Sequence, residues 1–392
     1  MTTRPLTVAW ISYFPVEWLP DGVPDEVMRV PIQHPGSWQR VLLGELEKAP
    51  GLQLHIVVVR KQFARNLTFV RNGVTFHLIR IRGGGRATSL FWADTMAIGR
   101  VLRSIQPDVV HAWGTEQGAA LVARRLGYPH VVTVQGLLAW YGLFVKQSGY
   151  ERLAAFLEKF SLARAPLVTS EARFSVQWVR HRNPRARVEQ VEHAPDWAFH
   201  QVRRQPQTKP LRFVFVGALD HRKGGDLVAR ALDQLRGEMP FELIVVGRRG
   251  RDVEETLARH VSREFWPQVV FKQNLTHLQV AEELRTATLA LCPSRADVSP
   301  NAVKEAVAAG VPVVATTVGG IPDYVLPGLN GLLCAPDSLA ELTAALRAAA
   351  QHPKFSRGEV DAATLGKMRD YLSPKLMAQR FLETYRLALA QK

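Results

Sequence analysis

The stretch TLALCPSRADVSPNAVKEAVAAGVPVVATTVGGIPDYVLPGLNGLLC, residues 288–334, decides the fold class of this chain. Its uncharged run Leu289–Cys292 is typical of a strand that is buried on both faces of a parallel sheet. Ser299 is placed to cap a helix that has Pro300 at its first position. A second apolar run, Val311–Thr316, follows that helix. The stretch therefore predicts a strand–helix–strand unit.

Polar residues gather where the helix of this unit begins. Asn301 and Glu305 are four residues apart and share a helix face, and Asp297 precedes them. The free N–H groups and the dipole of a helix N-terminus favour an anion. Because carboxylates hold hydroxyls and backbone donors hold phosphate, the pattern suits a nucleotide-sugar. The alternative is an ordinary unit with capping residues and solvated acids.

The length and composition of the chain set the broad class. A chain of 392 residues predicts two domains, and 47% hydrophobic with 22% charged residues indicates a folded soluble protein. We find no secretory signal and no apolar run long enough to span a membrane. Cys292 and Cys334 lie in apolar runs and are expected to be buried thiols. These features predict a cytoplasmic protein.

The positive charge of the chain narrows its partners. The net charge is +15, and the segment Arg60–Arg103 holds nine basic residues against one acid. Such a field favours polyanions, although an arginine-rich surface without a partner would look the same. No nucleic-acid-binding motif accompanies the charge, so we expect no nucleic acid. Peripheral contact with the inner face of an anionic membrane stays open.

Strand and helix patterns alternate in both halves of the chain. This alternation predicts an α/β fold with two Rossmann-like, doubly wound parallel-sheet domains. The polar, proline-bearing segment 200–210 is the expected linker. We therefore assign residues 1–205 to a first domain, 206–372 to a second domain, and 373–392 to a C-terminal helix.

Ligands of such folds bind in the loops that follow the strands. Arg222 and Lys223 lie between a buried strand and a helix start, which suits a diphosphate, although a solvated turn would have the same composition. The loops after two strands of the first half carry His111 with Glu116, and Gln135 with Gly136. On position alone, His111 is more often a buried structural histidine than a catalyst. The metal-chelating DxD motif is absent, so no metal is expected.

Taken together, these residues resemble the family 4 retaining glycosyltransferases of the GT-B fold. The resemblance is carried in the second half by VGALDHRKG (216–224), DVSPNAVKEAVAAGVPVVAT (297–316) and VGGIPD (318–323). In the first half it is carried by DVVH (108–111) and VTVQG (132–136). It covers most of the chain and is stronger in the second half.

The resemblance implies two Rossmann-like domains that face a cleft, with the nucleotide-sugar held mainly by the second. The family motif E-x7-E falls on Asp297 and Glu305, which would hold the donor sugar and the ribose. Lys223 would hold the donor diphosphate, and the terminal helix would pack back on the first domain. The other expected donor-site residues are Gly217, Arg222, Pro300, Asn301 and Ala302. The expected acceptor-side residues are Gly36, His111, Glu116, Gln135 and Gly136.

Departures from the family pattern affect the expected activity. Asp297 stands where the family has a glutamate, and Ala218 stands where it often has an arginine. A loop histidine of the family is Gln135 here. We expect a retaining, metal-independent hexosyltransferase that needs no cofactor and serves polysaccharide or related glycan synthesis. The acceptor hydroxyl could belong to a glycan, a lipid-linked sugar or a small molecule. The alternatives are a non-catalytic nucleotide-sugar-binding protein, and an epimerase or phosphorylase on the same fold.

Overall fold

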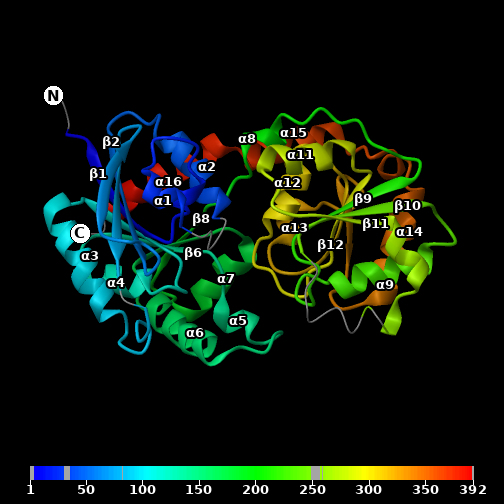
Figure 1. Ribbon diagram of the computed structural model, residues 1–392. Coiled ribbons are helices and arrows are strands. Elements are labelled where there is room, and N and C mark those ends of the chain that lie inside the picture. The colour runs from blue at the N-terminus through cyan, green and yellow to red at the C-terminus, as the bar shows by residue number, and fades with distance from the viewer. Residues whose placement is uncertain (1–3, 31–35, 82, 249–256, 258, 391–392) are drawn as a thin grey trace. The chain divides into compact units, whose positions relative to one another are not determined.

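The computed structural model describes residues 4–30, 36–81, 83–248, 257 and 259–390. The chain divides into two compact units, one of residues 1–193 with 374–392 and the other of residues 194–373. Each unit is built on one β-sheet with helices on both faces (Figure 1). Two doubly wound α/β units, as the sequence predicts, are therefore present. The division falls after His193, earlier than the expected boundary after residue 205.

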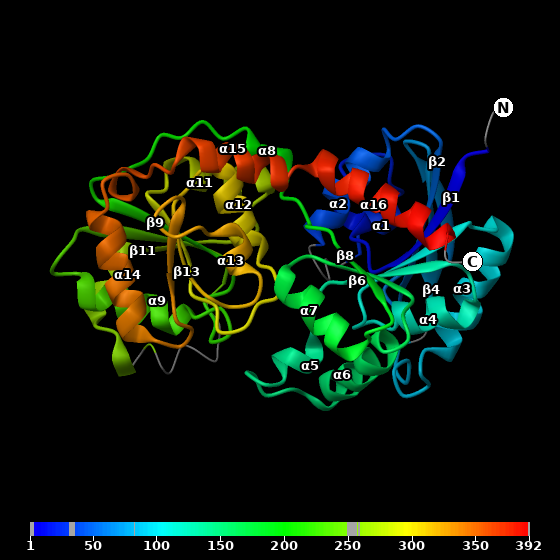
Figure 2. The same cartoon turned by 180° about the vertical axis from the view of Figure 1, so that it is seen from behind.

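The first unit holds an eight-stranded sheet in the order β3-β4-β2-β1-β5-β6-β7-β8. Only β3 pairs antiparallel among the described strands, through a hairpin with β4 that turns at Asn72 and Gly73. The terminal helix α16 packs on α2, while α3, α4 and α6 follow one another along the sheet (Figures 1 and 2). The elements are β1 (Leu6–Ser12), η1 (Val16–Trp18), α1 (Asp25–Met28), α2 (Ser37–Leu46), β2 (Leu52–Arg60), β3 (Leu67–Arg71), β4 (Val74–Arg80), α3 (Trp92–Ile105), β5 (Val109–Trp113), α4 (Ala119–Leu126), β6 (His130–Val134), α5 (Leu138–Tyr141), α6 (Gly149–Leu162), β7 (Leu167–Ser170), α7 (Arg173–Arg182), β8 (Arg187–Gln190) and α16 (Pro374–Leu389).

A chain of buried polar groups ties α16 to the centre of this sheet. Trp10 Nε1 donates to Tyr385 Oη at 2.9 Å, and Tyr385 Oη lies 2.9 Å from His111 Nδ1. His111 Nε2 lies 2.5 Å from Thr133 Oγ1, which continues to Thr169 Oγ1. Burial lowers the pKa of His111, so its ring is neutral. A neutral ring satisfies every partner if Tyr385 donates to Nδ1 and Nε2–H donates to Thr133.

The second unit holds a six-stranded parallel sheet in the order β11-β10-β9-β12-β13-β14. Helices α9 and α14 pack together on one face, and α11, α12 and α15 lie on the other (Figures 1 and 2). The elements are α8 (Trp197–His200), β9 (Leu211–Val216), α9 (Gly225–Leu235), β10 (Phe241–Val246), η2 (Arg263–Gln268), β11 (Val269–Lys272), α11 (His277–Thr286), β12 (Leu289–Cys292), α12 (Asn301–Ala309), β13 (Val313–Thr316), α13 (Ile321–Tyr324), β14 (Gly331–Cys334), α14 (Leu339–Gln351), η3 (Phe355–Arg357) and α15 (Ala362–Tyr371).

In each sheet the direction of strand addition reverses at one point. In the first unit this point lies between β1 and β5, and in the second between β9 and β12. Open parallel α/β sheets bind their ligands outside the carboxyl ends of the strands at such a point. The loops after these four strands are therefore where a site is expected.

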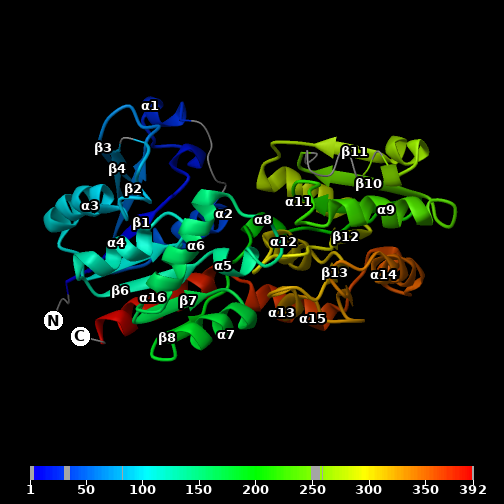
Figure 3. The same ribbon diagram turned by 90° about the horizontal axis from the view of Figure 1, so that it is seen from below.

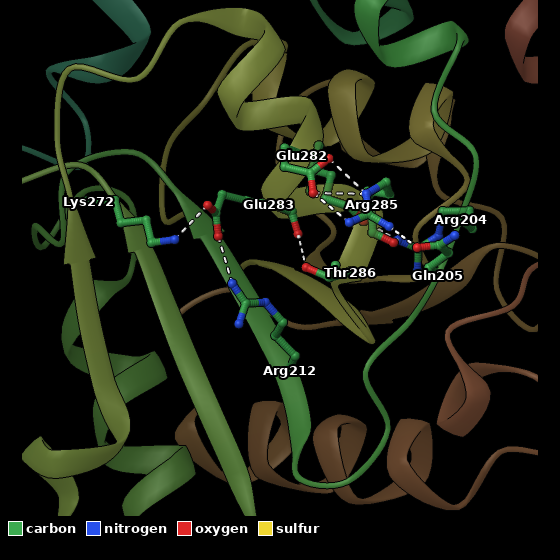
Figure 4. Close-up of polar contacts among 9 residues, drawn as sticks. Arg204, Gln205, Arg212, Lys272, Glu282, Glu283, Arg285 and Thr286 are labelled. Carbon is green, nitrogen blue, oxygen red and sulfur yellow. Dashed lines mark hydrogen bonds and ion pairs between the residues drawn. The ribbon is translucent and has the colours of Figure 1, made fainter.

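The expected linker, residues 200–210, packs firmly on the second unit. The guanidinium of Arg204 donates to the backbone carbonyls of Leu284, Arg285, Ala287 and Gly358. Figure 4 shows Arg204 and its neighbour Gln205 beside the end of α11, where the Gln205 N–H donates to Arg285 O at 2.9 Å. Burial lowers the pKa of Arg204 to about 10. Composition alone could not reveal these contacts, because the carbonyl groups come from distant segments.

One local expectation needs correction. The N-cap of α12 is Pro300 rather than Ser299, and the Ser299 hydroxyl instead lies 2.9 Å from the Tyr324 hydroxyl. The structure also contains a helix that the sequence did not predict, α15, which packs on α12. Cys292 and Cys334 are buried free thiols, as expected. Within the described ranges, none of the helices is long and apolar enough to cross a bilayer.

Candidate functional site

The loops after β9 and β12 come into direct contact in the second unit. Gly224 adopts φ 75° at the N-cap of α9, and a Cβ on it would lie 2.1 Å from Pro293 O. A Cβ on Gly319 would lie 1.9 Å from Asp297 O. Side chains cannot be accommodated at such distances, so these glycines are required for the loops to approach one another. The two motifs that carry the family resemblance are thus brought together.

A basic pair meets an acid at this point. The Lys223 ammonium forms an ion pair with Asp297 Oδ2, and Arg222 Nη1 lies 3.6 Å from the same oxygen. Asp297 is buried, whereas Lys223 and Arg222 remain partly exposed. Lys223 and Asp297 are 74 positions apart in the sequence and belong to separate motifs. The strand ends of the second unit therefore carry a site with two cationic side chains, Lys223 and Arg222, and one carboxylate, Asp297.

Sequence reasoning missed the residue that fastens the two loops. Arg295 donates to both carboxylate oxygens of the buried Asp226, at 2.6 and 2.7 Å, and to His221 O at 2.6 Å. Its Nε lies 2.6 Å from Asp337 Oδ1, and its backbone N–H donates to Arg222 O at 2.8 Å. Arg295 therefore positions the loop that carries Lys223. A signal was present, since Arg295 lies three residues after the end of a buried strand, and an arginine is rarely buried unless it is paired.

Helix α12 supplies the second predicted acid. Asn301 is its first residue, half-buried, and Glu305 follows one turn later with only 8% of its surface exposed. Burial raises the pKa of Glu305, while its electrostatic interactions with His277, Lys304 and Lys223 oppose the rise. The oxygens of a carboxyl group in this position can accept hydrogen bonds from hydroxyls.

The remaining donor-site candidates contribute backbone. Gly217 follows β9 with φ 137°, and its carbonyl oxygen would lie 2.1 Å from a Cβ on Gly247. Pro300 is buried at the N-cap of α12, and Ala302 is half-buried in its first turn. Among the described residues, no side chain caps the start of α12, so the first N–H groups of this helix lack a side-chain hydrogen-bond acceptor.

In the first unit, the structure brings Glu116, Gln135 and Gly136 together. A Cβ on Gly114 would lie 2.4 Å from Glu116 Oε2 and 3.0 Å from Gln135 Oε1. A Cβ on Gly136 would lie 3.0 Å from Glu116 Oε1. Burial raises the pKa of Glu116 to about 7, and the neighbouring carboxylate of Glu158 adds to the rise. Sequence reasoning missed Glu158, which is buried under the loop after β6 and accepts hydrogen bonds from Leu138 N and Ala139 N.

His111 does not belong to this group, and its expected place in the site needs correction. Its side chain has no exposed surface and points toward α16, where the hydroxyls of Tyr385 and Thr133 occupy both ring nitrogens. The reason is the alternation of side chains along β5, which turns residue 111 to the face that α16 covers. Gly36, with φ 42°, lies at the N-cap of α2 beside Pro15.

A pocket of about 540 Å³ opens beside the Glu116 loop, within the first unit. Its lining includes Tyr13 after β1, Lys61 after β2, Gln117, and Tyr150 of α6. The Tyr150 hydroxyl donates to Glu116 O at 3.2 Å, so the pocket borders the predicted acceptor-side residues. Aromatic rings beside amide and ammonium groups can hold a polyhydroxylated molecule.

Solved structures of similar architecture define the fold class. Sucrose-phosphate synthase from Thermosynechococcus elongatus superposes with a TM-score of 0.79 over 99% of this chain and 100% of that one, at 18% identity. The Anabaena protein Alr3699/HepE, solved in complex with UDP-glucose, gives a TM-score of 0.67 over 97% and 99% of the two chains, at 14% identity. The fold is therefore GT-B.

Sequence comparisons define the family. Residues 42–196 match the profile of Glycosyltransferase Family 4, and residues 210–352 match that of Glycosyl transferases group 1. Glycogen synthase of Mycobacterium tuberculosis is 26% identical over 268 residues. That match covers 67% of this chain and 64% of the relative's length. The chain belongs to glycosyltransferase family 4.

Proposed function

We propose that this protein is a retaining, metal-independent glycosyltransferase. It moves a sugar from a nucleotide-diphosphate-sugar to an acceptor hydroxyl. The observation that carries the proposal is the ion pair of Lys223 with Asp297, between adjacent strand ends and ahead of α12. The UDP-glucose complex of the structurally similar HepE supports a nucleotide-sugar as the donor class. The absence of a DxD motif from the sequence supports metal independence.

Each donor-site residue has a role in this proposal. Lys223, assisted by Arg222, binds the diphosphate and stabilises the charge that develops on it as it leaves. Glu305 accepts hydrogen bonds from the ribose hydroxyls, and Asp297 accepts them from the sugar. Asn301 and the uncapped N–H groups at the start of α12 complete the anion site. A diphosphate competes with Asp297 for the Lys223 ammonium, so donor binding leaves this carboxylate available to the sugar.

The transfer step fits a site without a covalent nucleophile. The bond from the anomeric carbon to the phosphate oxygen breaks, and the acceptor oxygen bonds to that carbon from the same face. The proton of the acceptor hydroxyl passes to the departing phosphate oxygen. We place the acceptor in the pocket of the first unit that includes Tyr13 and Tyr150, next to Glu116. The two free, buried cysteines support a location in the reducing cytoplasm.

Calorimetric titration with UDP-, GDP- and ADP-sugars tests the donor class. We expect one nucleotide to bind in the micromolar range and to do so equally well in EDTA. Failure of all three to bind would refute the proposal. Turnover unchanged by EDTA would support metal independence, and product analysis of the anomeric configuration would test retention.

A second candidate function is donor binding without transfer. Ala218 favours it, because a family arginine that would assist the diphosphate is missing at this position. Donor binding without hydrolysis or transfer across a broad acceptor panel would favour this candidate. The variant Ala218→Arg then provides a check, since it restores the missing cation.

A further inference from the structure

Helix α6 of the first unit exposes apolar side chains on the face that points away from the sheet. Phe156 and Phe160 are 64% and 37% exposed, and they are four residues apart on one face. The opposite face is properly buried through Ala154, Leu157 and Leu162. The outer face of a helix that meets only water usually carries polar side chains. Two exposed phenylalanines on one face of a helix therefore indicate a binding surface.

The same arrangement recurs on α3. Trp92 and Met96, also four residues apart, are 57% and 59% exposed. Helix α4 contacts both α3 and α6, and Figure 3 shows the three helices in the order α3, α4, α6. The four apolar side chains therefore belong to one layer of adjacent helices. We call the surface formed by these four side chains and the adjacent Arg124, Arg125 and Arg164 the aromatic–basic face; its apolar residues are Trp92, Met96, Phe156 and Phe160.

Arginines stand among these apolar side chains. The guanidinium carbon of Arg124 lies 5.3 Å from the ring centre of Phe160, and that of Arg164 lies 4.2 Å from it. Arg125 lies 4.5 Å from the ring centre of Trp92. Other exposed basic side chains of α3 and α6 are Arg100, Arg103, Arg152 and Lys159. Their long side chains can extend charge toward a surface while the stems cover apolar area.

Acids are nearly absent from the outside of these helices. Asp94 of α3 and Glu158 of α6 are buried, and α4 contains no acid. The exposed Glu151 lies in the first turn of α6, where it completes the capping box with Ser148. The aromatic–basic face therefore combines apolar anchors with an excess of positive charge. That combination complements a surface with an apolar interior and negatively charged headgroups.

We propose that the aromatic–basic face docks the protein on an anionic lipid bilayer. The aromatic side chains enter the headgroup boundary, and the arginines and lysines bind the lipid phosphates. Tyr150 and Leu153, which line the pocket of the first unit, belong to the same α6, six and three residues before Phe156. Docking through α6 thus holds that pocket close to the lipid surface. This inference goes beyond the proposed transfer reaction and does not depend on it.

Vesicle flotation tests the proposal on the full chain. We use phosphatidylcholine vesicles with and without about 30% phosphatidylglycerol. We expect flotation with the anionic vesicles at low salt and little with the neutral ones. Raising the salt from about 0.05 to about 0.5 M shortens the screening length and should weaken binding severalfold. Flotation that is equal on neutral and anionic vesicles, or no flotation at low salt, would overturn the proposal.

Variants separate the two contributions. Phe156→Ser with Phe160→Ser should lower partitioning at least about tenfold. Arg124→Gln with Arg164→Gln should lower it by about fivefold for each charge near the surface. The matched control is Val70→Ser, which removes an exposed apolar side chain from β3 and should leave partitioning unchanged.

Light scattering distinguishes lipid from a second copy of the chain as the occupant. If wild type forms a concentration-dependent dimer that the phenylalanine variant abolishes, and vesicles do not compete with it, the face is a self-association surface and the proposal fails. Urea unfolding should be the same in all variants, which shows that the first unit, where the substitutions lie, remains folded. Donor binding by calorimetry, which the proposed function assigns to the second unit, should also be unchanged, so a failure of docking and a failure of the proposed transfer function can be told apart.

Discussion

The two units place their candidate residues at equivalent points of similar sheets, yet they use them differently. In the second unit the loops after β9 and β12 present charged side chains, with Lys223 and Arg222 against Asp297. In the first unit the loops after β5 and β6 present a half-buried Glu116 between the backbones of Gly114 and Gly136. The histidine expected to join it is part of the core. One site is organised by ion pairs between loops, and the other by close backbone approach.

The two sites should therefore be sensitive to different substitutions. An ion-paired site is sensitive to the loss of a charge, because removing one partner leaves the other buried and unpaired. A site formed by backbone approach is sensitive to protonation and to added side-chain volume. The predictions below test this contrast, beginning with the largest expected effect.

The largest effect is expected at Lys223. Lys223→Ala removes the ammonium that stabilises the departing diphosphate, and we expect the transfer rate to fall by about 10³-fold. Steady-state kinetics with the donor found by calorimetry measures it. Lys223→Arg should retain part of the rate, and Lys209→Ala, at an exposed lysine of the same unit, should retain all of it. If Lys223→Ala turned over at the wild-type rate, the ion-paired residues of the second unit would not be needed for transfer, and the contrast between the two units would be wrong.

Arg295 should matter mainly for stability. Arg295→Met leaves the buried Asp226 without its two hydrogen bonds, so the free energy of unfolding of the second unit should fall by about 3 kcal/mol. Urea unfolding measures the change. The matched control is Arg347→Met, which breaks an exposed pair with Glu238 and should cost less than about 1 kcal/mol. Equal losses in the two variants would show that Arg295 does not fasten the loops.

His111 should behave as a structural residue. His111→Phe removes the hydrogen bonds of the ring to the Tyr385 and Thr133 hydroxyls, which keep only Trp10 and Thr169 as partners, so the free energy of unfolding of the first unit should fall by about 2 kcal/mol. Donor affinity and kcat/KM of the folded variant should stay within about twofold of wild type. His181→Phe, at an exposed histidine of α7, should cost little. A large loss of kcat without a loss of stability would return His111 to the catalytic site.

Glu116 gives the smallest and most specific effect, a pH dependence. The folded-state pKa of about 7 lies above the ordinary value of 4.5, so the folded protein retains a proton that the unfolded chain has lost. The contribution of Glu116 to stability is therefore complete below about pH 4.5 and is lost as the pH rises to about 7. Glu116→Gln should remove this decline, which is about 2 kcal/mol or less. Urea unfolding at pH 5 and 7.5 measures it, with Glu383→Gln, at an exposed position, as the control.

Local pattern carried the prediction of the elements. The uncharged run Leu289–Cys292 was predicted to be a buried strand, and it forms β12. Short helices such as α5 and α8 were missed, since four residues are too few to show a period. The helix α15 was missed because its polar sequence has no pronounced apolar face, and its support comes from contact with α12.

What the sequence alone determined is the class of fold, the family and the positions of Lys223, Asp297 and Glu305, because these depend on spacing within short motifs. Which of these residues come into contact depends on the tertiary structure. Three contacts join residues that are far apart in the chain. They are the ion pair of Lys223 with Asp297, the ion pair of Arg295 with Asp226, and the contact of His111 with Tyr385 of α16. The burial of Glu116, and therefore its raised pKa, likewise depends on residues distant in the sequence, such as Glu158. The contacts and the pKa cannot be derived from local sequence, because both depend on all the residues packed around a side chain.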